Sequence, residues 1–317
     1  MRYFRLFPLV VNLIACSTLF PLQAQTPDAA VRSFREGDRQ VKKGDWAGAI
    51  ESYTRAIEIS SHLATLPHSS KRGIANSFAE SDAEANVITV VDPFTARAYS
   101  NRSFAFYNQR DFDRAIADAD QALRINPGLA AAFLNRGAAR RVKEDLAEAM
   151  ADFNRAIALD PQLFEAFNNR GALKHDLGDV EGALLDLNRA IALNDRLPEA
   201  YYHRGYVLLA KHDFAGATAD FSRSIALRPT FSWSHQGRGT VLMNQMDYPG
   251  ALKAFNRALE LDPSLSVACL NRGLVFLLMG RDSDAQKDFG RCLALSPELK
   301  DEVEKRIQLA KELRSRP

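Results

Sequence analysis

The chain has 317 residues, of which 46% are hydrophobic and 25% are charged, and this composition excludes a disordered chain or one with several membrane spans. The formal net charge of +2 at pH 7 comes entirely from Arg2 and Arg5, so the rest of the sequence is neutral. Because no basic excess is left to neutralise a phosphate backbone, nucleic acid is not expected as a partner.

Residues 1–24 are predicted to form a secretory signal peptide. A short basic region precedes a mostly apolar stretch, and the small residue Ala24 stands before the polar Gln25. Prolines and an asparagine interrupt the stretch, which makes it too short for a membrane span. A second interpretation stays open, because Leu13-Ile14-Ala15-Cys16 resembles a bacterial lipobox that would make Cys16 the lipidated first residue.

Both interpretations predict an exported protein. Cleavage after Ala24 would give a periplasmic or secreted chain, whereas lipidation would give an outer-membrane lipoprotein whose only membrane contact is the lipid on Cys16. Mass spectrometry of the mature N-terminus separates the two, because a chain that starts at Gln25 excludes lipidation.

The remaining sequence is built from a repeat. A tripeptide of Asn-Arg-Gly type returns every 34 residues, and its arginine keeps its register as Arg102, Arg136, Arg170, Arg204, Arg238 and Arg272. A fixed period of this length indicates one supersecondary unit stacked on copies of itself. With the glycine as position 8, and with an earlier unit centred on Gly37, the units are 30–63, 96–129, 130–163, 164–197, 198–231, 232–265 and 266–299.

Each unit is predicted to be a helical hairpin. Position 20 is alanine in all seven units, position 24 is large and apolar in six, and position 32 is proline in five. Small residues at positions 8 and 20 let two antiparallel helices approach closely, the ring at position 24 fills the space beside them, and proline ends the second helix. The turns are expected near position 15, where three units carry Gly44, Gly178 and Gly280.

This pattern resembles the tetratricopeptide-repeat family. The resemblance implies an all-α, right-handed superhelical solenoid of about seven hairpins, with a protein or peptide as partner, no cofactor and no enzymatic activity. Two local departures are Ser33, where the family often has a large residue at position 4, and the arginine at the usually apolar position 7.

The arginine at position 7 is predicted to pair with an aspartate across its own hairpin. Positions whose numbers sum to about 31 lie opposite each other, and position 23 is aspartate in five of these units, so a charge-assisted bond would hold the helices in register. Arg155, Arg189 and Arg291 compete for the carboxylates from the same helix. Arg238 faces Ala254 and lacks the pair. The predicted pairs are Arg102–Asp118, Arg136–Asp152, Arg170–Asp186, Arg204–Asp220 and Arg272–Asp288.

Residues 64–95 break the period between the first two units. The segment opens with loop-type residues and ends with the apolar run 87–91. It is either a surface loop or a functional element, whose apolar run would fold over the groove or pair with a partner strand. After the last unit, residues 300–316 are predicted to form an amphipathic capping helix, which packs through Val303, Ile307, Ala310 and Leu313.

No catalytic or metal site is predicted. None of the six histidines stands at metal-ligand spacing from another ligand, and no Gly-rich phosphate loop follows a strand. Cys269 and Cys292 hold positions 4 and 27 of the last unit, so they are expected to face each other. A disulfide and a pair of buried thiols both stay open, because the usual separation of helix axes strains a disulfide.

The candidate binding residues follow from the resemblance, in which the first helix of each unit lines a concave groove. Position 6 forms a column that resembles the asparagine ladder of O-GlcNAc transferase, with Asn101, Asn135, Asn169, His203, Gly237 and Asn271. Asparagine amides can bond the backbone of an extended peptide, or they can bond the neighbouring helix, and both readings stay open. Aromatic residues that suit binding anchors are Phe104, Tyr107, Tyr202, Tyr206 and Trp233.

The sequence therefore predicts an exported, non-enzymatic scaffold or adaptor that binds a peptide or protein segment in its groove. One alternative is a lipid-anchored envelope lipoprotein that organises a cell-wall or outer-membrane assembly. Another is an enzyme whose site is hidden in residues 64–95. A clamp for an acidic chain terminus is not predicted, because position 5 carries no lysine.

Overall fold

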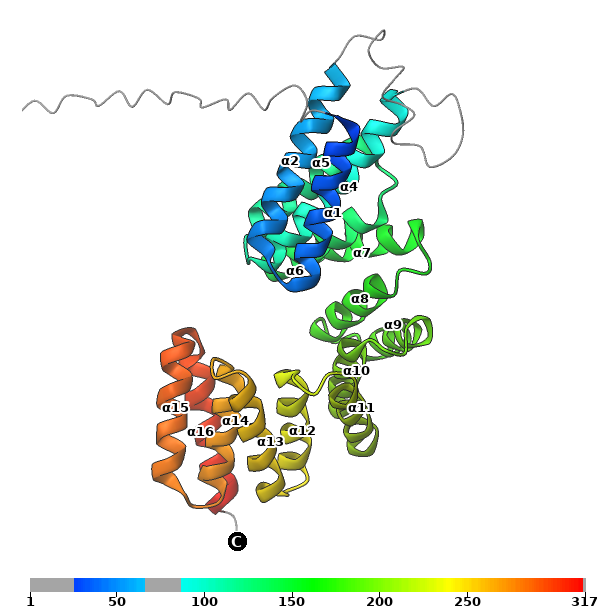
Figure 1. Ribbon diagram of the computed structural model, residues 1–317. Helices are drawn as coiled ribbons and strands as arrows, with labels where there is room; N and C mark the ends of the chain where they lie inside the picture. Colours follow the sequence, from blue (N-terminus) through cyan, green and yellow to red (C-terminus); the bar gives the residue numbers. More distant parts are fainter. Residues whose placement is uncertain (1–25, 66–86, 316–317) are drawn as a thin grey trace, which may run out of the picture. The chain divides into compact units, whose positions relative to one another are not determined.

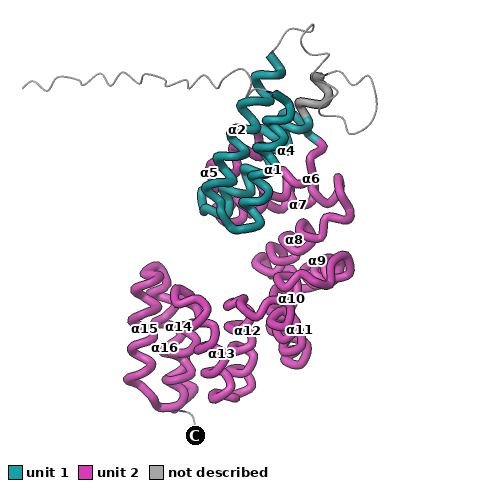
Figure 2. The backbone as a smooth tube through the Cα atoms, viewed as in Figure 1, with its two compact units in different colours: residues 1–111, 121–127 teal, residues 112–120, 128–317 magenta. Residues whose placement is uncertain are grey.

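The computed structural model describes residues 26–65 and 87–315. The predicted signal peptide, with Cys16, and most of the predicted insertion lie outside these residues. Every element in the described ranges is a helix, which confirms the all-α class, and none of these helices has the length and hydropathy of a membrane span. Contacts divide the chain into two compact units (Figure 2). Of the described residues, unit 1 holds 26–65, 87–111 and 121–127, and unit 2 holds 112–120 and 128–315.

Unit 1 contains α1 (Pro27–Lys43), α2 (Trp46–Thr65), α4 (Val87–Asn108) and the end of α5 (Phe112–Ile125). α1 begins where the side chain of Thr26 accepts a hydrogen bond from the backbone N–H of Ala29, and it ends at Gly44. α1 and α2 form a hairpin against which α4 packs. The shared core consists of Phe34, Ala49, Tyr53, Ala56, Ile57, Ala98 and Ala105.

α4 corrects the prediction for the end of the insertion. The apolar run 87–91 forms the first turns of this helix, so its backbone is not a strand ready to pair with a partner. Because the run continues directly into the first helix of the next hairpin, extending that helix requires no new nucleation. Pro93 lies inside α4 and removes only one backbone donor.

Unit 2 is a row of helical hairpins that starts with the beginning of α5 (Figure 1). Within each hairpin from α6 to α15 the two helices pack on each other, and from α8 onward each first helix also packs on the second helix of the hairpin before it. The hairpins pair α6 (Ala130–Val142) with α7 (Leu146–Leu159), α8 (Phe164–Asp176) with α9 (Val180–Leu193), α10 (Pro198–Ala210) with α11 (Phe214–Leu227), α12 (Ser232–Asn244) with α13 (Tyr248–Leu261), and α14 (Ser266–Leu278) with α15 (Asp282–Leu295).

Close packing within the hairpins depends on the glycine at position 8. A Cβ added to Gly137 would lie 2.8 Å from the ring of Phe153, and one added to Gly205 would lie 2.9 Å from the ring of Phe221. Both rings are fully buried, so neither has room to move aside. The predicted roles of positions 8 and 24 in helix packing are confirmed.

Each turn between paired helices places one residue in the left-handed region. Gly44, Gly178 and Gly280 do so, with φ between 74° and 82°, as their sequence positions predict. The other turns hold residues with a Cβ in the same conformation, at φ between 60° and 66°, namely Arg110, Glu144, His212 and Met246. This conformation costs a non-glycine residue about 1–2 kcal/mol, which packing of the flanking helices must offset.

α16 (Lys300–Ser315) follows the short 3-10 helix η2 (Pro297–Leu299) and packs on α14 as a cap. Three of the four predicted apolar residues contact the core of the last hairpin, namely Val303, Ile307 and Ala310. The fourth prediction is wrong, because Leu313 is 47% exposed. Its neighbour Arg314 donates to the backbone carbonyl of Leu277 and pairs with Asp282, and these contacts hold the end of the cap.

Candidate functional site

The arginine at position 7 joins the two helices of its own hairpin. In unit 2 the guanidinium donates two hydrogen bonds of 2.6–3.0 Å to one aspartate. The carboxylates are only 3–5% exposed, so this bidentate contact is a buried one. The pairs that the structure brings together are Arg136–Asp152, Arg170–Asp186, Arg204–Asp220 and Arg272–Asp288.

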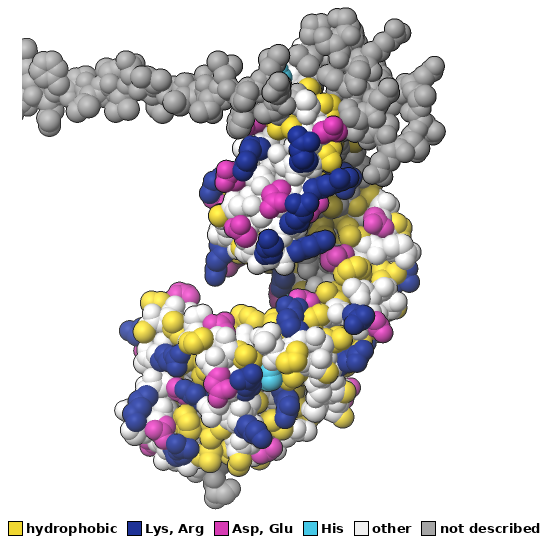
Figure 3. Space-filling model, viewed as in Figure 1, with side chains coloured by type: hydrophobic (Ala, Val, Ile, Leu, Met, Phe, Trp, Pro, Cys, Tyr) yellow, Lys and Arg dark blue, Asp and Glu magenta, His cyan; other side chains and the backbone are white. Residues whose placement is uncertain are grey.

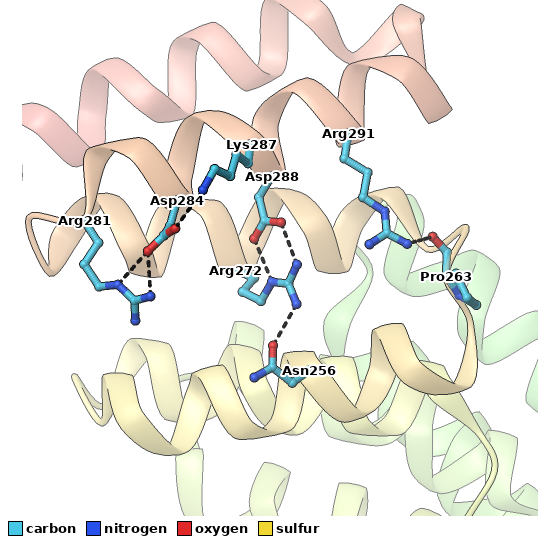
Figure 4. A network of polar contacts seen from close by, with 8 residues as sticks. All are labelled: Asn256, Pro263, Arg272, Arg281, Asp284, Lys287, Asp288 and Arg291. Atoms are coloured by element: carbon cyan, nitrogen blue, oxygen red, sulfur yellow. Dashed lines mark hydrogen bonds and ion pairs between the residues drawn. The ribbon is translucent and has the colours of Figure 1, made fainter.

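The same guanidinium also reaches the preceding hairpin, a contact that sequence reasoning missed. Its Nη1 donates over 2.6–2.8 Å to the side chain at position 25 of the previous second helix. Figure 4 shows Arg272 between Asp288 of α15 and Asn256 of α13. A signal was available, because position 25 repeats as a polar residue in Asp120, Asn154, Asn188 and Asn256.

The remaining arginines behave in different ways. Among the described residues, Arg238 is exposed and has no carboxylate within ion-pair distance, as expected opposite Ala254. Arg291 does not compete for Asp288 but donates to the backbone carbonyl of Pro263 at 2.6 Å (Figure 4). Arg102 donates to Thr54 at 2.8 Å within unit 1. The pair of Arg102 with Asp118 of unit 2 stays a prediction.

The first helices of unit 2 form a continuous row, because α6 packs on α8, α8 on α10, α10 on α12, and α12 on α14. We call the side of this row that carries positions 2, 5, 6 and 9 the inner face. Of the predicted binding residues, the inner face carries Asn135, Asn169, Tyr202, His203, Tyr206, Trp233 and Asn271. Asn101, Phe104 and Tyr107 lie on α4 in unit 1, where the ring of Phe104 packs edge-on against Trp46 at 5.9 Å.

The asparagines of the column have different partners. Asn101 donates to Asp38 at 3.2 Å and Asn271 donates to Thr240 at 3.3 Å, in both cases on the preceding first helix. These two amides therefore bond the neighbouring helix. Asn169 instead accepts from Asn168 of the same helix at 3.2 Å, and Asn135 is half-buried on α6.

An aromatic cluster interrupts the column. A Cβ on Gly237 would lie 2.3 Å from the ring of Phe221, so position 6 has no room for a side chain there. Tyr202 lies at the centre of the cluster, and its ring centroid is 5.2 Å from that of Tyr206 and 6.4 Å from that of Trp233. Phe231, which the sequence did not single out, packs 5.4 Å from Tyr202. Trp233 remains 41% exposed.

Three buried oxygen atoms on α8 and α14 accept no hydrogen bond within the described residues, namely Glu165 Oε2, Asn168 Oδ1 and Asn271 Oδ1. Burial raises the pKa of Glu165. Since buried polar atoms nearly always have a partner, these three acceptors are exceptions within the described residues. They belong to positions 2, 5 and 6, which are inner-face positions.

Burial shifts the pKa of several titratable groups of unit 2. Burial lowers the pKa of His203 to about 3, and the positive charges of Arg141 and His175 act in the same direction. Cys269 and Cys292 are buried free thiols, and burial raises the pKa of both. Within the described ranges, no three His, Cys, Asp or Glu side chains are grouped to hold a metal ion.

Comparison with known proteins agrees with this architecture. The model of the tetratricopeptide repeat matches residues 96–129, and a TPR repeat model matches residues 139–178 and 172–212. No curated protein matches the chain.

Solved structures share the fold. A tetratricopeptide repeat protein from Parabacteroides merdae ATCC 43184 is similar with a TM-score of 0.60 at 16% identity, over 90% of this chain and 99% of that one. The APC/C hetero-tetramer Cut9-Hcn1 is similar with a TM-score of 0.63 at 16% identity, over 92% of this chain and 57% of that one. For pilF of Pseudomonas aeruginosa the TM-score is 0.53 at 18% identity, over 64% of this chain and 92% of that one.

Proposed function

The chain is a tetratricopeptide-repeat protein, and from this premise we propose that the inner face of unit 2 binds an extended segment of a partner protein. The contacts proposed are mainly to the peptide backbone, because asparagine amides both donate and accept hydrogen bonds. In this proposal the protein is a scaffold or adaptor and carries out no catalysis.

The observation that carries the proposal is the set of acceptors without donors on the inner face. Glu165 Oε2, Asn168 Oδ1 and Asn271 Oδ1 are buried, and a buried acceptor that lacks a donor costs about 1–3 kcal/mol. Backbone N–H groups of a bound segment would supply the donors. Asn135 and Asn169 of the column would complete the polar contacts on α6 and α8.

The aromatic cluster would contribute a second kind of contact. Trp233 is 41% exposed beside Tyr202, and large rings of this type often provide most of the affinity at protein interfaces. Figure 3 shows both signs of charge mixed over the visible side of unit 2. Hydrogen bonds and aromatic contacts, rather than net charge, would therefore select the ligand.

We also infer that the protein acts outside the cytoplasm, because residues 1–24 have the pattern of a signal peptide. The alternative is a lipoprotein anchored through Cys16 that organises a cell-wall or outer-membrane assembly. The inner face would bind its partner in the same way in both cases. The mature N-terminus decides between them, as Gln25 or as lipidated Cys16.

Site-specific crosslinking tests where a peptide binds. Peptides are first selected from a random library on the full chain, and a photo-reactive phenylalanine analogue then replaces Trp233. Leu185, which is 72% exposed on the second helix α9, receives the same analogue as the matched control. We expect the selected peptide to crosslink to position 233 and not to position 185. Equal labelling of both positions, or labelling of position 185 alone, would contradict binding at the inner face.

A further inference from the structure

A pocket of about 400 Å³ lies on unit 1 beside α1 and α2. Four arginines line it, and Glu36 is the one carboxylate among the lining residues. This volume is within the range of sites that hold small ligands or a few side chains. The arginines are Arg32, Arg35 and Arg39 on α1 and Arg55 on α2.

The first hairpin lacks the buried ion pair that most of the later hairpins have. Positions 7 and 23, which are arginine and aspartate in most hairpins of unit 2, are Glu36 and Ser52 here. Ser52 is 2% exposed and is one of the two residues of α2 that line the pocket.

The charges around the pocket are predominantly positive. Arg39 pairs with Glu36 at 2.6 Å and Arg55 pairs with Glu51 at 2.9 Å, but both contacts are solvent-exposed and hold the side chains only weakly. Among the described residues, Arg32 has no carboxylate within ion-pair distance. Figure 3 shows Lys and Arg side chains on the visible side of unit 1, with Asp and Glu side chains among them.

The place of the pocket in the repeat indicates what would occupy it. In unit 2, the arginine at position 7 reaches the second helix of the preceding hairpin, where Arg136 binds the carboxylate of Asp120 at 2.6 Å. The pocket carries Arg32, Glu36 and Arg39 at positions 3, 7 and 10 of the first hairpin, with Arg35 at position 6 beside them, and α2 is the helix that packs on α1. A helix or strand with carboxylates would therefore continue the contacts found within the array.

We propose that this pocket is a docking site for an acidic segment of a partner protein, whose carboxylates bind Arg32, Arg39 and Arg55. Guanidinium groups bind carboxylates in a bidentate manner, so several arginines in one pocket favour a segment with successive acidic side chains. The site is separate from the inner face and does not depend on the function proposed for it.

Fluorescence anisotropy with the full chain tests the proposal. The probe is a fluorescein-labelled peptide with six consecutive glutamates, and a peptide with six serines serves as the uncharged control. We expect binding of the acidic peptide only, and a fall in affinity of at least about tenfold when Arg32 and Arg55 are both replaced by glutamate. The matched control is Arg155→Glu with Arg189→Glu, which makes the same change of net charge at two exposed positions of unit 2 and should change the affinity less than about twofold.

Several outcomes would overturn the proposal. The first is that the acidic peptide does not bind, and the second is that both charge-reversed variants lose affinity equally. The third is full displacement of the peptide by inorganic phosphate at the same molar concentration as the peptide, which would indicate a site for any small anion. Replacement of Arg32 and Arg55 by glutamine removes the charges without adding acidic groups. This variant keeps the test decisive if circular dichroism shows that the glutamate variant is unfolded.

Discussion

Replacing Asp152 by alanine is expected to lower the free energy of unfolding by about 2–4 kcal/mol. The Asp152 carboxylate is 3% exposed and accepts two hydrogen bonds from Arg136 and one from Arg140. The hydrogen bonds with Asp152 raise the pKa of Arg136, because they favour the charged form of the guanidinium. Removing the carboxylate leaves two partly buried cations without their shared partner.

Urea unfolding followed by circular dichroism measures this loss, and Asp120→Ala provides the control. Asp120 accepts from the same arginine at 2.6 Å, but its side chain is 45% exposed, so its removal should cost less than about 1 kcal/mol. Similar losses in the two variants would show that burial of the carboxylate does not set the strength of the contact.

The second large effect is expected from His203, as a loss of stability in mild acid. Its ordinary pKa of 6.5 is lowered to about 3 by burial, with Arg141 and His175 as the charged neighbours and Tyr202 packed on the ring. Below pH 6.5 the unfolded chain binds a proton that the folded chain does not, so stability falls as the pH drops from 6.5 toward 3. Between pH 7 and pH 5 the loss from this group should be about 1–2 kcal/mol.

His203→Asn tests this effect, because asparagine is the residue of the same column in four other units. The variant lacks the titrating ring but keeps Glu165. The raised pKa of Glu165 favours the folded state as the pH falls, and it does so in both wild type and variant. The difference in unfolding free energy between wild type and variant should therefore narrow or reverse as the pH falls from 7 to 5. A difference that stays constant over this range would show that His203 is protonated equally in the folded and unfolded chains.

Repeat structure could be predicted from the sequence because its signals are local and recur. The 34-residue period, the alanine at position 20 and the glycine at position 8 each report packing within one hairpin. The contact of Arg272 with Asn256 was missed because it joins two hairpins. Position numbers within one unit do not tell which residues of neighbouring hairpins lie opposite each other. The turns at Glu144 and Met246 lie at the expected position 15, but their left-handed conformation was not predicted, since nothing in these residue types favours it.

The candidate site could be predicted only in part. The position 6 residues lie on the first helices, and the partners of two of their amides are position 9 residues of the first helix before them. Asn101 and Asn271 meet Asp38 and Thr240 there and are held by the fold. The gap at Gly237 follows from the Phe221 ring, which comes from the hairpin before it. Such contacts between units depend on tertiary packing, which no single-unit pattern contains.

The most direct test of binding at the inner face is the affinity of a selected peptide for the double variant Asn135→Ala with Asn169→Ala. Isothermal titration with the full chain should give a dissociation constant at least about tenfold weaker than that of the wild type, equivalent to about 1.4 kcal/mol. The matched control is Asn154→Ala with Asn256→Ala, which removes two amides from the second helices α7 and α13 and should leave the affinity unchanged. An unchanged affinity in the first variant, or an equal loss in both, would contradict peptide binding by the asparagine column.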